Sequence, residues 1–400
     1  MAYLKNTAVN LLNAHYAIHA VAMNAAGVFF AVFLLRAGVP LPLVFGAIAL
    51  LLAGRFVVRP LVLVLAPKCG LRVLVIFGLL FSAVPYLLLP SIHGPDLMLL
   101  GFCAAAAIGE AFYWTSYHAS FAYLGDGEHR GHQIGAREAI ASISGIVGPL
   151  IGGWALMQFG ARTAFTAAAL VQALAALPLL GIPKIEVPST IPGGFRAARS
   201  GFLLFACDGW ITAGLYFAWQ VALFLSLGES FSAFGGALAV AGLAGAVTSL
   251  ALGRHIDGGH GAIAVGITFA AVSGLTLFRA LATGHAAIAV MANACGAVVV
   301  CLYIPTLMTA VYNQAKQSPC PLRFHAAAEG GWDAGGAAGC LLVALLTWAG
   351  VPLPVCILTA LPGIALSYGL LRRYYAGIAS PVSGEYALAG GEAAAVARNP

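Results

Sequence analysis

Four charged side chains stand out because each lies inside a long apolar stretch of the chain. Glu110 occurs in AAAAIGEAFYWTSYH and Asp208 in FACDGWITAG. Arg55 and Arg59 are four residues apart in LLAGRFVVRPL. A carboxyl group in such surroundings can take up and release a proton, and a guanidinium can pair with a carboxylate or hold an anionic ligand. These residue types indicate proton transfer, ion pairing or charge recognition.

The stretches that hold these residues are predicted to be membrane-spanning helices. Of the 400 residues, 61% are hydrophobic and 8% are charged, against about 25% charged in soluble domains. Apolar runs of about 20 residues follow one another, and they are too continuous for barrel strands, whose residues alternate. Twelve spans are predicted, at about 14–35, 41–66, 71–90, 96–123, 136–159, 163–183, 200–227, 231–252, 261–282, 285–312, 325–349 and 352–372.

The lysines and arginines predict how the chain is oriented. Positive charge is disfavoured on the translocated side of a membrane. With the amino terminus inside, fourteen of these residues fall in inner loops and termini, and only Arg36, Arg162 and Arg279 fall outside. We therefore predict a multi-pass protein of the cell inner (plasma) membrane with both termini cytoplasmic. The net charge of +6 is explained by the inner loops, so no nucleic-acid partner is expected.

An internal repeat predicts an all-α integral membrane protein with two bundles of six helices. A displacement of 187 to 191 positions aligns AAGVFFA (25–31) with TAGLYFA (212–218), and Tyr113 with Tyr303. It also aligns Glu138 with Glu329. The predicted parts are an N-terminal bundle (1–183), a cytosolic linker (184–199), a C-terminal bundle (200–375) and a disordered cytosolic tail (376–400).

In this organisation the chain resembles the major facilitator superfamily of transporters over nearly its whole length. Two segments are similar to that family's loop motif, GxxxDRxGRR. LAPKCGLR (65–72) has Pro67 in place of the acid, and GRHIDGG (253–259) keeps Asp257. The resemblance implies alternating access between the two bundles, with the first, fourth, seventh and tenth spans lining a central cavity.

GIVGPLIGG (145–153) is similar to the family's fifth-span motif, Gx8GxxxGPxxGG, which is associated with efflux antiporters. Gly135 is in place and Ser144 replaces one glycine. We read the stretch as a helix whose small residues form one face for close packing on a neighbouring helix that moves. The residues assigned to this contact are Gly145, Gly148, Pro149, Gly152 and Gly153.

The resemblance places Glu110 on the substrate path, where it and Asp208 are the candidates for proton coupling. Carboxylates near tryptophan suit a cationic or amphipathic ligand. For each there is a structural alternative, a hydrogen bond to a neighbouring helix for Glu110 and an ion pair with an arginine for Asp208. The candidates for lining the cavity are Asn24, Arg55, Arg59, Tyr113, Trp114, Trp219 and Gln220.

Arg55 and Arg59 share one helix face because they are four residues apart. Two interpretations remain open for them: a salt bridge to Glu110 or Asp208 that acts as a gate, or recognition of a carboxylate or phosphate on the substrate. Arg59 is also close enough to the predicted inner surface for its long side chain to reach water.

Two inner segments at corresponding places, 125–138 and 321–333, are predicted to close the inner side through charge pairs. Each pair is expected to be partly wet and worth about 1 kcal/mol or less, which favours reversible gating. The residues assigned to these pairs are Arg130, Arg137, Glu138, Arg323, Glu329 and Asp333, with Asp257 in the second loop motif.

Other motifs predict neither an enzyme nor a cofactor site. His15 and His19 are also four residues apart, but no second pair matches them, so polar lining is favoured over a metal site. His118 is a candidate for assisting proton transfer or an interface histidine. The eight cysteines show no CxxC pair, the GxxxxGK[ST] phosphate loop is absent, and no nucleophile, base and orienting group come together.

The sequence thus predicts a proton-coupled secondary active transporter that works as a monomer in the lipid bilayer. Its expected partners are protons and a small-molecule substrate, with export of small amphipathic or cationic compounds as the preferred direction. The alternatives are proton-coupled uptake of an organic anion or other metabolite, bound by Arg55 or Arg59, and a membrane scaffold or sensor that transports nothing. Buried charges in both halves argue against the last.

Overall fold

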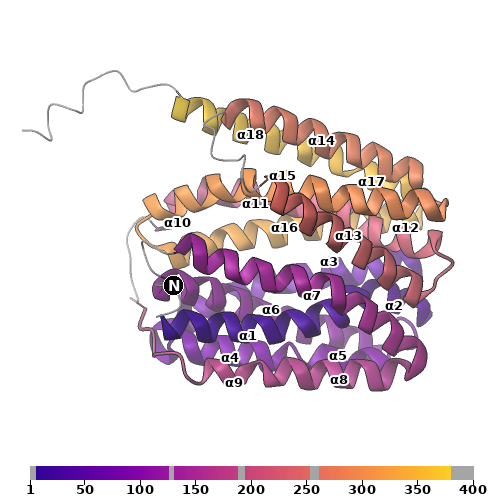
Figure 1. Ribbon diagram of the computed structural model, residues 1–400. Helices are drawn as coiled ribbons and strands as arrows, with labels where there is room; N and C mark the ends of the chain where they lie inside the picture. Colours follow the sequence, from indigo (N-terminus) through magenta and orange to yellow (C-terminus); the bar gives the residue numbers. More distant parts are fainter. Residues whose placement is uncertain (1–5, 126–129, 188–193, 253–260, 380–400) are drawn as a thin grey trace, which may run out of the picture.

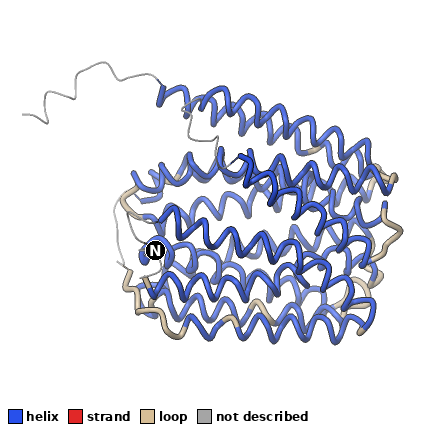
Figure 2. Tube along the Cα trace, viewed as in Figure 1, coloured by secondary structure: helices blue, strands red, loops and turns tan. Residues whose placement is uncertain are grey.

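Long apolar helices joined by short loops make up the described part of the chain in the computed structural model, which covers residues 6–125, 130–187, 194–252 and 261–379 (Figures 1 and 2). Within these residues, twelve helical segments are long and apolar enough to cross a membrane, as predicted. The first begins at Thr7, earlier than expected, because the Asn6 side chain accepts a hydrogen bond from the Val9 amide at 3.1 Å and caps the helix.

The first six spans form the N-terminal bundle. They are α1 (Thr7–Ala25) with η2 (Gly27–Phe29) and α2 (Phe30–Arg36); α3 (Leu41–Cys69); α4 (Leu71–Phe81) with α5 (Val84–Leu88) and η3 (Leu89–Ser91); α6 (Leu97–Leu124); α7 (Arg130–Gln158); and α8 (Gly160–Leu174) with α9 (Ala176–Leu179).

The short helix α10 (Gly194–Ala197) precedes the C-terminal bundle of six spans. These are α11 (Arg199–Thr212) with the π-helical η4 (Ala213–Ala218) and α12 (Trp219–Ser226); α13 (Phe231–Leu252); α14 (Gly261–Ala282); α15 (Ala286–Gln317); α16 (Pro321–Trp348); and α17 (Leu353–Leu358) with α18 (Ala360–Ala379).

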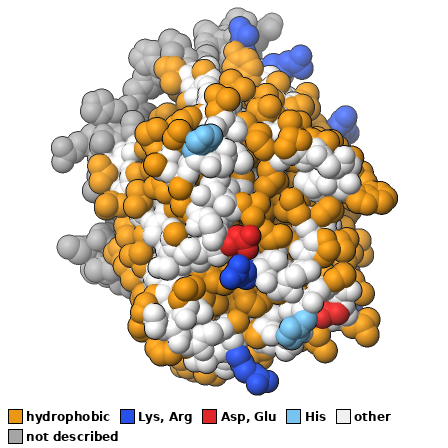
Figure 3. All heavy atoms as spheres, turned by 90° about the vertical axis from the view of Figure 1, so that its right-hand side faces the viewer, with side chains coloured by type: hydrophobic (Ala, Val, Ile, Leu, Met, Phe, Trp, Pro, Cys, Tyr) orange, Lys and Arg blue, Asp and Glu red, His pale blue; other side chains and the backbone are white. Residues whose placement is uncertain are grey.

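The helix ends lie at two faces of the molecule. The start of α1, the end of α9, the helix α10 and the end of α18 lie at one face, on the left in Figure 1, which we call the linker face. Turns lie at the opposite face, and six of them contain a glycine with positive φ, as at Gly38, where Val39 N donates to Leu34 O at 3.0 Å and closes the helix end. Figure 3 looks onto this opposite face, which carries few charged side chains.

The sides of the bundles expose large apolar side chains, as a surface in contact with lipid does. Leu97, Leu281 and Trp348 are each more than three-quarters exposed, and Val57 and Val247 are also exposed. Charged side chains such as Arg55, Arg59 and Asp333 are instead buried inside the molecule. A multi-pass protein is the arrangement that accounts for this distribution.

Two helix pairs bring the bundles together, α3 against α16 and α7 against α13. Near the opposite face an aromatic cluster joins them, because Phe29 contacts Phe234 at a ring-centroid distance of 5.6 Å and Phe33 contacts Phe231 at 6.3 Å. One continuous hydrophobic core therefore contains side chains of both bundles.

The aligned stretches 25–31 and 212–218 both depart from regular α-helix. The first contains the 3-10 turn η2 and the second the π-helix η4. Short π segments inside α-helices are frequent at functional sites. The two bundles thus share an irregularity at corresponding places in the first and seventh spans.

The glycine-rich stretch is helical, and it packs closely against two neighbouring helices rather than one. A Cβ added at Gly148 would lie 2.7 Å from the Asn24 Cβ, and one at Gly152 would collide with the Ala25 carbonyl, so both glycines face α1 of the same bundle. The carbonyls of Gly145 and Pro149 instead face glycines 242 and 235 of α13 in the other bundle. The helix α7 is therefore packed closely on two sides.

This packing predicts that Gly152→Ala destabilises the fold while Gly145→Ala does not. The new methyl group at position 152 has to displace the Ala25 backbone, at a cost of about 1–3 kcal/mol. Position 145 has no atom within 4 Å of an added Cβ, so the better helix former is accommodated. Thermal unfolding in detergent micelles measures both. Equal unfolding temperatures for the two variants would contradict the packing argument.

Candidate functional site

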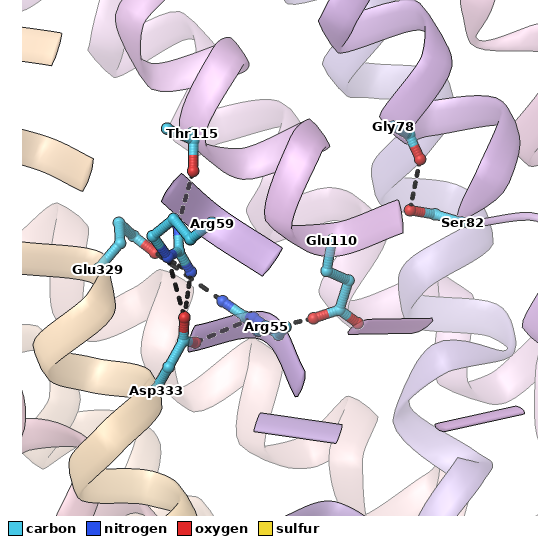
Figure 4. A network of polar contacts seen from close by, with 8 residues as sticks. All are labelled: Arg55, Arg59, Gly78, Ser82, Glu110, Thr115, Glu329 and Asp333. Atoms are coloured by element: carbon cyan, nitrogen blue, oxygen red, sulfur yellow. Dashed lines mark hydrogen bonds and ion pairs between the residues drawn. The ribbon is translucent and has the colours of Figure 1, made fainter. Parts of the chain in front are cut away.

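The charged residues of three spans meet between the bundles (Figure 4). Arg55 and Arg59 lie on one face of α3, and Glu329 and Asp333, also four residues apart, lie on one face of α16. Glu110 of α6 joins them from the side. The N-terminal bundle thus supplies both guanidinium groups, and the C-terminal bundle supplies two of the three carboxylates. We call these five residues the charge cluster.

Arg59 holds the centre of the charge cluster. Its Nη2 and Nε atoms lie 2.5 Å and 2.9 Å from one carboxylate oxygen of Asp333, and its Nη1 donates to the Thr115 hydroxyl at 2.6 Å. A Glu329 oxygen lies 3.8 Å from Nη2. The guanidinium therefore joins α3, α6 and α16.

Arg55 divides its charge between the bundles. Its Nη1 donates to Glu110 at 2.6 Å, within the N-terminal bundle. Its Nε lies 3.0 Å from the other oxygen of Asp333, and its Nη2 lies 3.9 Å from Glu329, both in the C-terminal bundle. The same guanidinium lies over the Trp332 ring, 5.3 Å from the centroid. Any change in charge at Glu110 therefore acts directly on a contact between the bundles.

Burial makes the charge balance of the cluster important. The Asp333 side chain is fully buried, Arg59 is 3% exposed and Arg55 7%, whereas Glu110 is 36% exposed. Removing one partner from a buried ion pair costs about 3–5 kcal/mol, because the other charge is left without compensation. Two guanidiniums face three carboxylates here, so one bound proton makes the cluster electrically neutral.

The partners of Glu329 and Asp333 differ from the predicted ones. The inner-loop arginines were expected to pair with them, but Arg137 lies against the rings of Tyr16 and Phe121, and Arg323 against Phe195. The two acids pair with arginines of α3 instead, and Asp333 is dry rather than partly wet. The side chains of Arg130 and Glu138 are not described, and Asp257 lies outside the described residues.

A cavity of about 320 Å³ opens beside Glu110, mostly within the N-terminal bundle. Its wall is largely apolar and aromatic, and Glu110 is the only carboxylate among the described residues that line it. The C-terminal bundle contributes Tyr216, Phe217 and Trp332. Of the predicted lining residues, this cavity contains Asn24, Arg55, Tyr113 and Trp114, but neither Arg59, which is enclosed in the charge cluster, nor Trp219 and Gln220. We call it the first cavity.

A second cavity of about 360 Å³ lies in the C-terminal bundle. Its lining includes Asp208, Trp219 and Gln220, together with Arg279 of α14 and Tyr303 of α15. The Tyr303 hydroxyl donates to Asp208 at 2.7 Å. Asp208 forms no ion pair with an arginine among the described residues, so that structural alternative does not apply in this conformation.

Trp332 connects the charge cluster to the second cavity. Its ring lies under the Arg55 guanidinium, and its indole N–H, which can only donate, lies near the Asp208 carboxylate. Asp208 and Arg55 are thus both neighbours of the same side chain, although they belong to different bundles.

The histidines have different surroundings. His15 contacts the Ala175 carbonyl at 2.7 Å and the Tyr113 hydroxyl at 2.9 Å, and His19 contacts Gln172 at 2.9 Å. Nε2 of His118 lies 3.9 Å from Glu329, at the edge of the charge cluster. Within the described residues no group of histidine, cysteine and acidic side chains has the arrangement of a metal site.

Sequence reasoning missed three residues at these sites. Thr115 and Trp332 are neutral, so no charge marked them. Arg279 was assigned to the outer side, although it falls inside the predicted span 261–282. It is only 8% exposed. Its position inside a span was the signal that could have found it.

Comparison with known proteins agrees with this architecture. A family model described as Major Facilitator Superfamily matches residues 12–319. The chain therefore belongs to the Major Facilitator Superfamily. A search of curated protein sequences gave no significant match.

Solved transporter structures share the fold at low sequence identity. The human organic anion transporter MFSD10 (TETRAN) is 16% identical with a TM-score of 0.68, over 91% of this chain and 99% of that one. An auto-inhibited POT family peptide transporter is 14% identical with a TM-score of 0.63, over 91% and 96%. The transporter FucP in its outward conformation is 15% identical with a TM-score of 0.64, over 92% and 98%. These likenesses establish the transporter fold.

The buried pair predicts a large loss of stability for Asp333→Asn. The amide keeps the shape of the side chain but removes the charge that two buried guanidiniums share, so the free energy of unfolding should fall by about 3–5 kcal/mol. Glu229→Gln is the matched control, because Glu229 pairs with Arg36 at 3.1 Å on the exposed surface, where a pair contributes about 1 kcal/mol or less. Thermal unfolding in detergent compares them, and equal losses would refute the distinction.

Proposed function

We propose that the protein is a proton-coupled secondary active transporter of the inner (plasma) membrane that works by alternating access. The charge cluster carries this proposal, because three carboxylates compete for two guanidiniums across the contact between the bundles. Both bundles and both cavities belong to one chain, which supports a monomer as the working unit. The bundle limits at 183 and 200, the cytosolic placement of the linker and termini, and the disordered tail from 376 onward are part of the same proposal.

Glu110 is the proposed proton site. It is the most exposed member of the charge cluster and lines the first cavity. When Glu110 is ionised, it draws the Arg55 guanidinium toward the N-terminal bundle. When it is protonated, that attraction is lost and Arg55 is left to the carboxylates of the C-terminal bundle. Proton occupancy thereby changes how strongly the bundles hold one another, as a coupled carrier requires.

The first cavity supports an amphipathic or cationic substrate. Trp114, Tyr86 and Tyr113 offer ring faces and edges near Glu110, and an organic cation is attracted both to such rings and to the carboxylate. A cation and a proton would then compete for one carboxylate, so that binding of one releases the other. This competition favours exchange of protons for the substrate, and the close packing of α7 on two helices suits an exporter of the kind suggested by the motif at 145–153.

Asp208 is the proposed second ionisable site, linked to the charge cluster through Trp332. Tyr303 donates a hydrogen bond to the Asp208 carboxylate, and the Trp332 indole N–H lies near it. A proton or a ligand at Asp208 would weaken its interaction with Trp332 and so change the position of the ring under Arg55. Binding at Asp208 in the C-terminal bundle would then affect the charge cluster, and a proton at Glu110 would affect Asp208.

A second candidate function is proton-coupled uptake of an organic anion. Arg55 and Arg59 are occupied by carboxylates, which argues against them as substrate ligands in this conformation. The observation that favours an anion is instead Arg279, a buried cation in the second cavity. The similarity in fold to an organic anion transporter is compatible with either substrate class.

Proton movement in proteoliposomes tests the function. Purified protein is given a panel of cationic, neutral and anionic solutes while internal and external pH are followed. Proton release driven by cations supports export, and proton entry coupled to anions supports uptake. Absence of any coupled flux across the panel would favour the scaffold or sensor and refute the proposal.

Glu110→Gln is expected to uncouple transport from protons. The amide cannot be ionised, so net transport driven by a pH gradient should fall at least about tenfold, while exchange of labelled for unlabelled substrate persists. Glu229→Gln, on the exposed surface, controls for loss of a carboxylate and should transport normally. Unchanged proton coupling in Glu110→Gln would remove Glu110 from the mechanism.

Trp332→Phe tests the link between the bundles. Phenylalanine keeps a ring under Arg55 but loses the polar N–H near Asp208. Because an N–H that donates to a charged group can contribute about 1.5–3 kcal/mol, coupled transport should slow by about tenfold or more if this N–H transmits the effect. Trp348→Phe, at a side chain that is 79% exposed, is the control. Equal transport by both variants would show that Trp332 is only a packing residue.

A further inference from the structure

Arg279 is a buried cation whose usual partner is missing. Its side chain belongs to the last turn of α14 and is 8% exposed. Among the described residues it forms no ion pair. Its Nη1 donates to the Leu215 carbonyl of η4, and its Nε has no hydrogen-bond partner. A guanidinium that is out of water and without a carboxylate is costly, which points to an anion that the second cavity receives.

The surroundings of Arg279 hold the guanidinium in place without neutralising it. The guanidinium carbon of Arg279, Cζ, lies 4.9 Å from the centroid of the Trp219 ring. The Trp219 indole is itself fixed, because its N–H donates a 3.0 Å hydrogen bond to Asn293. On another side Nη2 rests directly on Gly296, where any Cβ would collide with it. The fork of donors is therefore oriented before a ligand arrives, as effective binding of a carboxylate requires.

A second polar group in the same cavity lacks a partner. Gln220, one residue after Trp219, is 7% exposed, and its carbonyl oxygen accepts no hydrogen bond. A buried primary amide that is not fully bonded can serve a ligand as donor or acceptor. Arg279 and Gln220 both line the second cavity, so two independent side chains there have unused polar atoms.

The rest of the second cavity sets the shape of the ligand. Between the polar ends its wall is aliphatic, with Leu238, Val272, Leu275 and Val299. Asp208 lies at the other end. It is seven residues before Leu215, the residue whose carbonyl Arg279 contacts, and this spacing corresponds to roughly 10 Å along the helix. A second negative charge on the ligand would approach Asp208, so a monoanion is favoured over a dianion.

We propose that the second cavity binds an amphipathic organic monocarboxylate, with the carboxylate on Arg279 and the apolar body along the aliphatic wall. The proposal rests on the second candidate function and locates its substrate in the C-terminal bundle. An anionic lipid headgroup, chloride or phosphate offers the same charge, and the structural alternative is that Arg279 only supports the Leu215 carbonyl. These alternatives differ from the proposal, and from one another, in which probes the protein is expected to bind.

Binding is measured by thermal stabilisation and titration calorimetry on the purified full chain in nanodiscs of neutral phosphatidylcholine. The probes are 4-phenylbutanoate, its neutral amide, the amine with the same ring and chain, a dicarboxylate, chloride and inorganic phosphate. Saturable binding of the monocarboxylate at least tenfold tighter than that of every other probe is expected. Equal binding of the amide, saturation by chloride or phosphate alone, or stabilisation seen only with anionic lipid would overturn the proposal.

Variants assign the binding to Arg279. Arg279→Gln should weaken monocarboxylate binding at least tenfold, and Arg279→Lys should weaken it less because the charge remains. Gly296→Ala keeps the arginine but displaces its guanidinium, so it should also weaken binding, and it serves if Arg279→Gln does not fold. Gly274→Ala is its control, because an added Cβ there meets no atom within 4 Å. Unchanged affinity in Arg279→Gln, or in Gly296→Ala if Arg279→Gln does not fold, would overturn the assignment.

These measurements use no proton gradient. A failure to bind the monocarboxylate is therefore distinct from a failure of proton coupling at Glu110. Failure to bind the monocarboxylate would refute the anion site but not the proposed carrier mechanism. Failure of proton coupling at Glu110 would refute the mechanism but not the anion site.

Discussion

Burial of two guanidinium groups between the bundles is the constraint on which the arrangement depends. Each arginine must find a carboxylate because water is not available to it. The spacing of four residues on α3 is matched by the same spacing on α16, so two charges on each helix meet face to face. The ion pairs between α3 and α16 hold the bundles together strongly, but only while all their members keep their charges.

The third carboxylate, that of Glu110, allows the ion pairs of the charge cluster to rearrange. With two arginines and two acids the contact would be balanced and would have no reason to rearrange. Glu110 adds a competitor that belongs to the same bundle as the arginines and faces a cavity. Its charge therefore decides how Arg55 divides its interaction between the bundles, and a proton reaching the cavity can alter a contact that is itself closed to water.

Hydrophobicity and charge in the sequence were sufficient to predict the fold and to offer Glu110 as a partner of Arg55, but not the other partners of the buried charges. The spans follow from long apolar runs, which need no knowledge of tertiary structure. Glu329 and Asp333 were identified as gating residues, yet they were assigned to inner-loop arginines. Partner choice depends on how α3 crosses α16, and a single sequence does not encode that crossing in any local pattern. Arg279 shows the same limit, because counting loop charges ignores the direction in which a side chain at a helix end points.

Trp332 gives the two cavities a physical route of communication. Its ring lies under Arg55 of the charge cluster, and its N–H lies near Asp208 of the second cavity. Coupling between two binding sites is reciprocal as a matter of thermodynamics. If occupancy of the second cavity shifts Trp332 and so weakens its contact with Arg55, then protonation of Glu110 must change the affinity of the second cavity by the same factor. A solute held in the C-terminal bundle and a proton held in the N-terminal bundle would then be linked without touching.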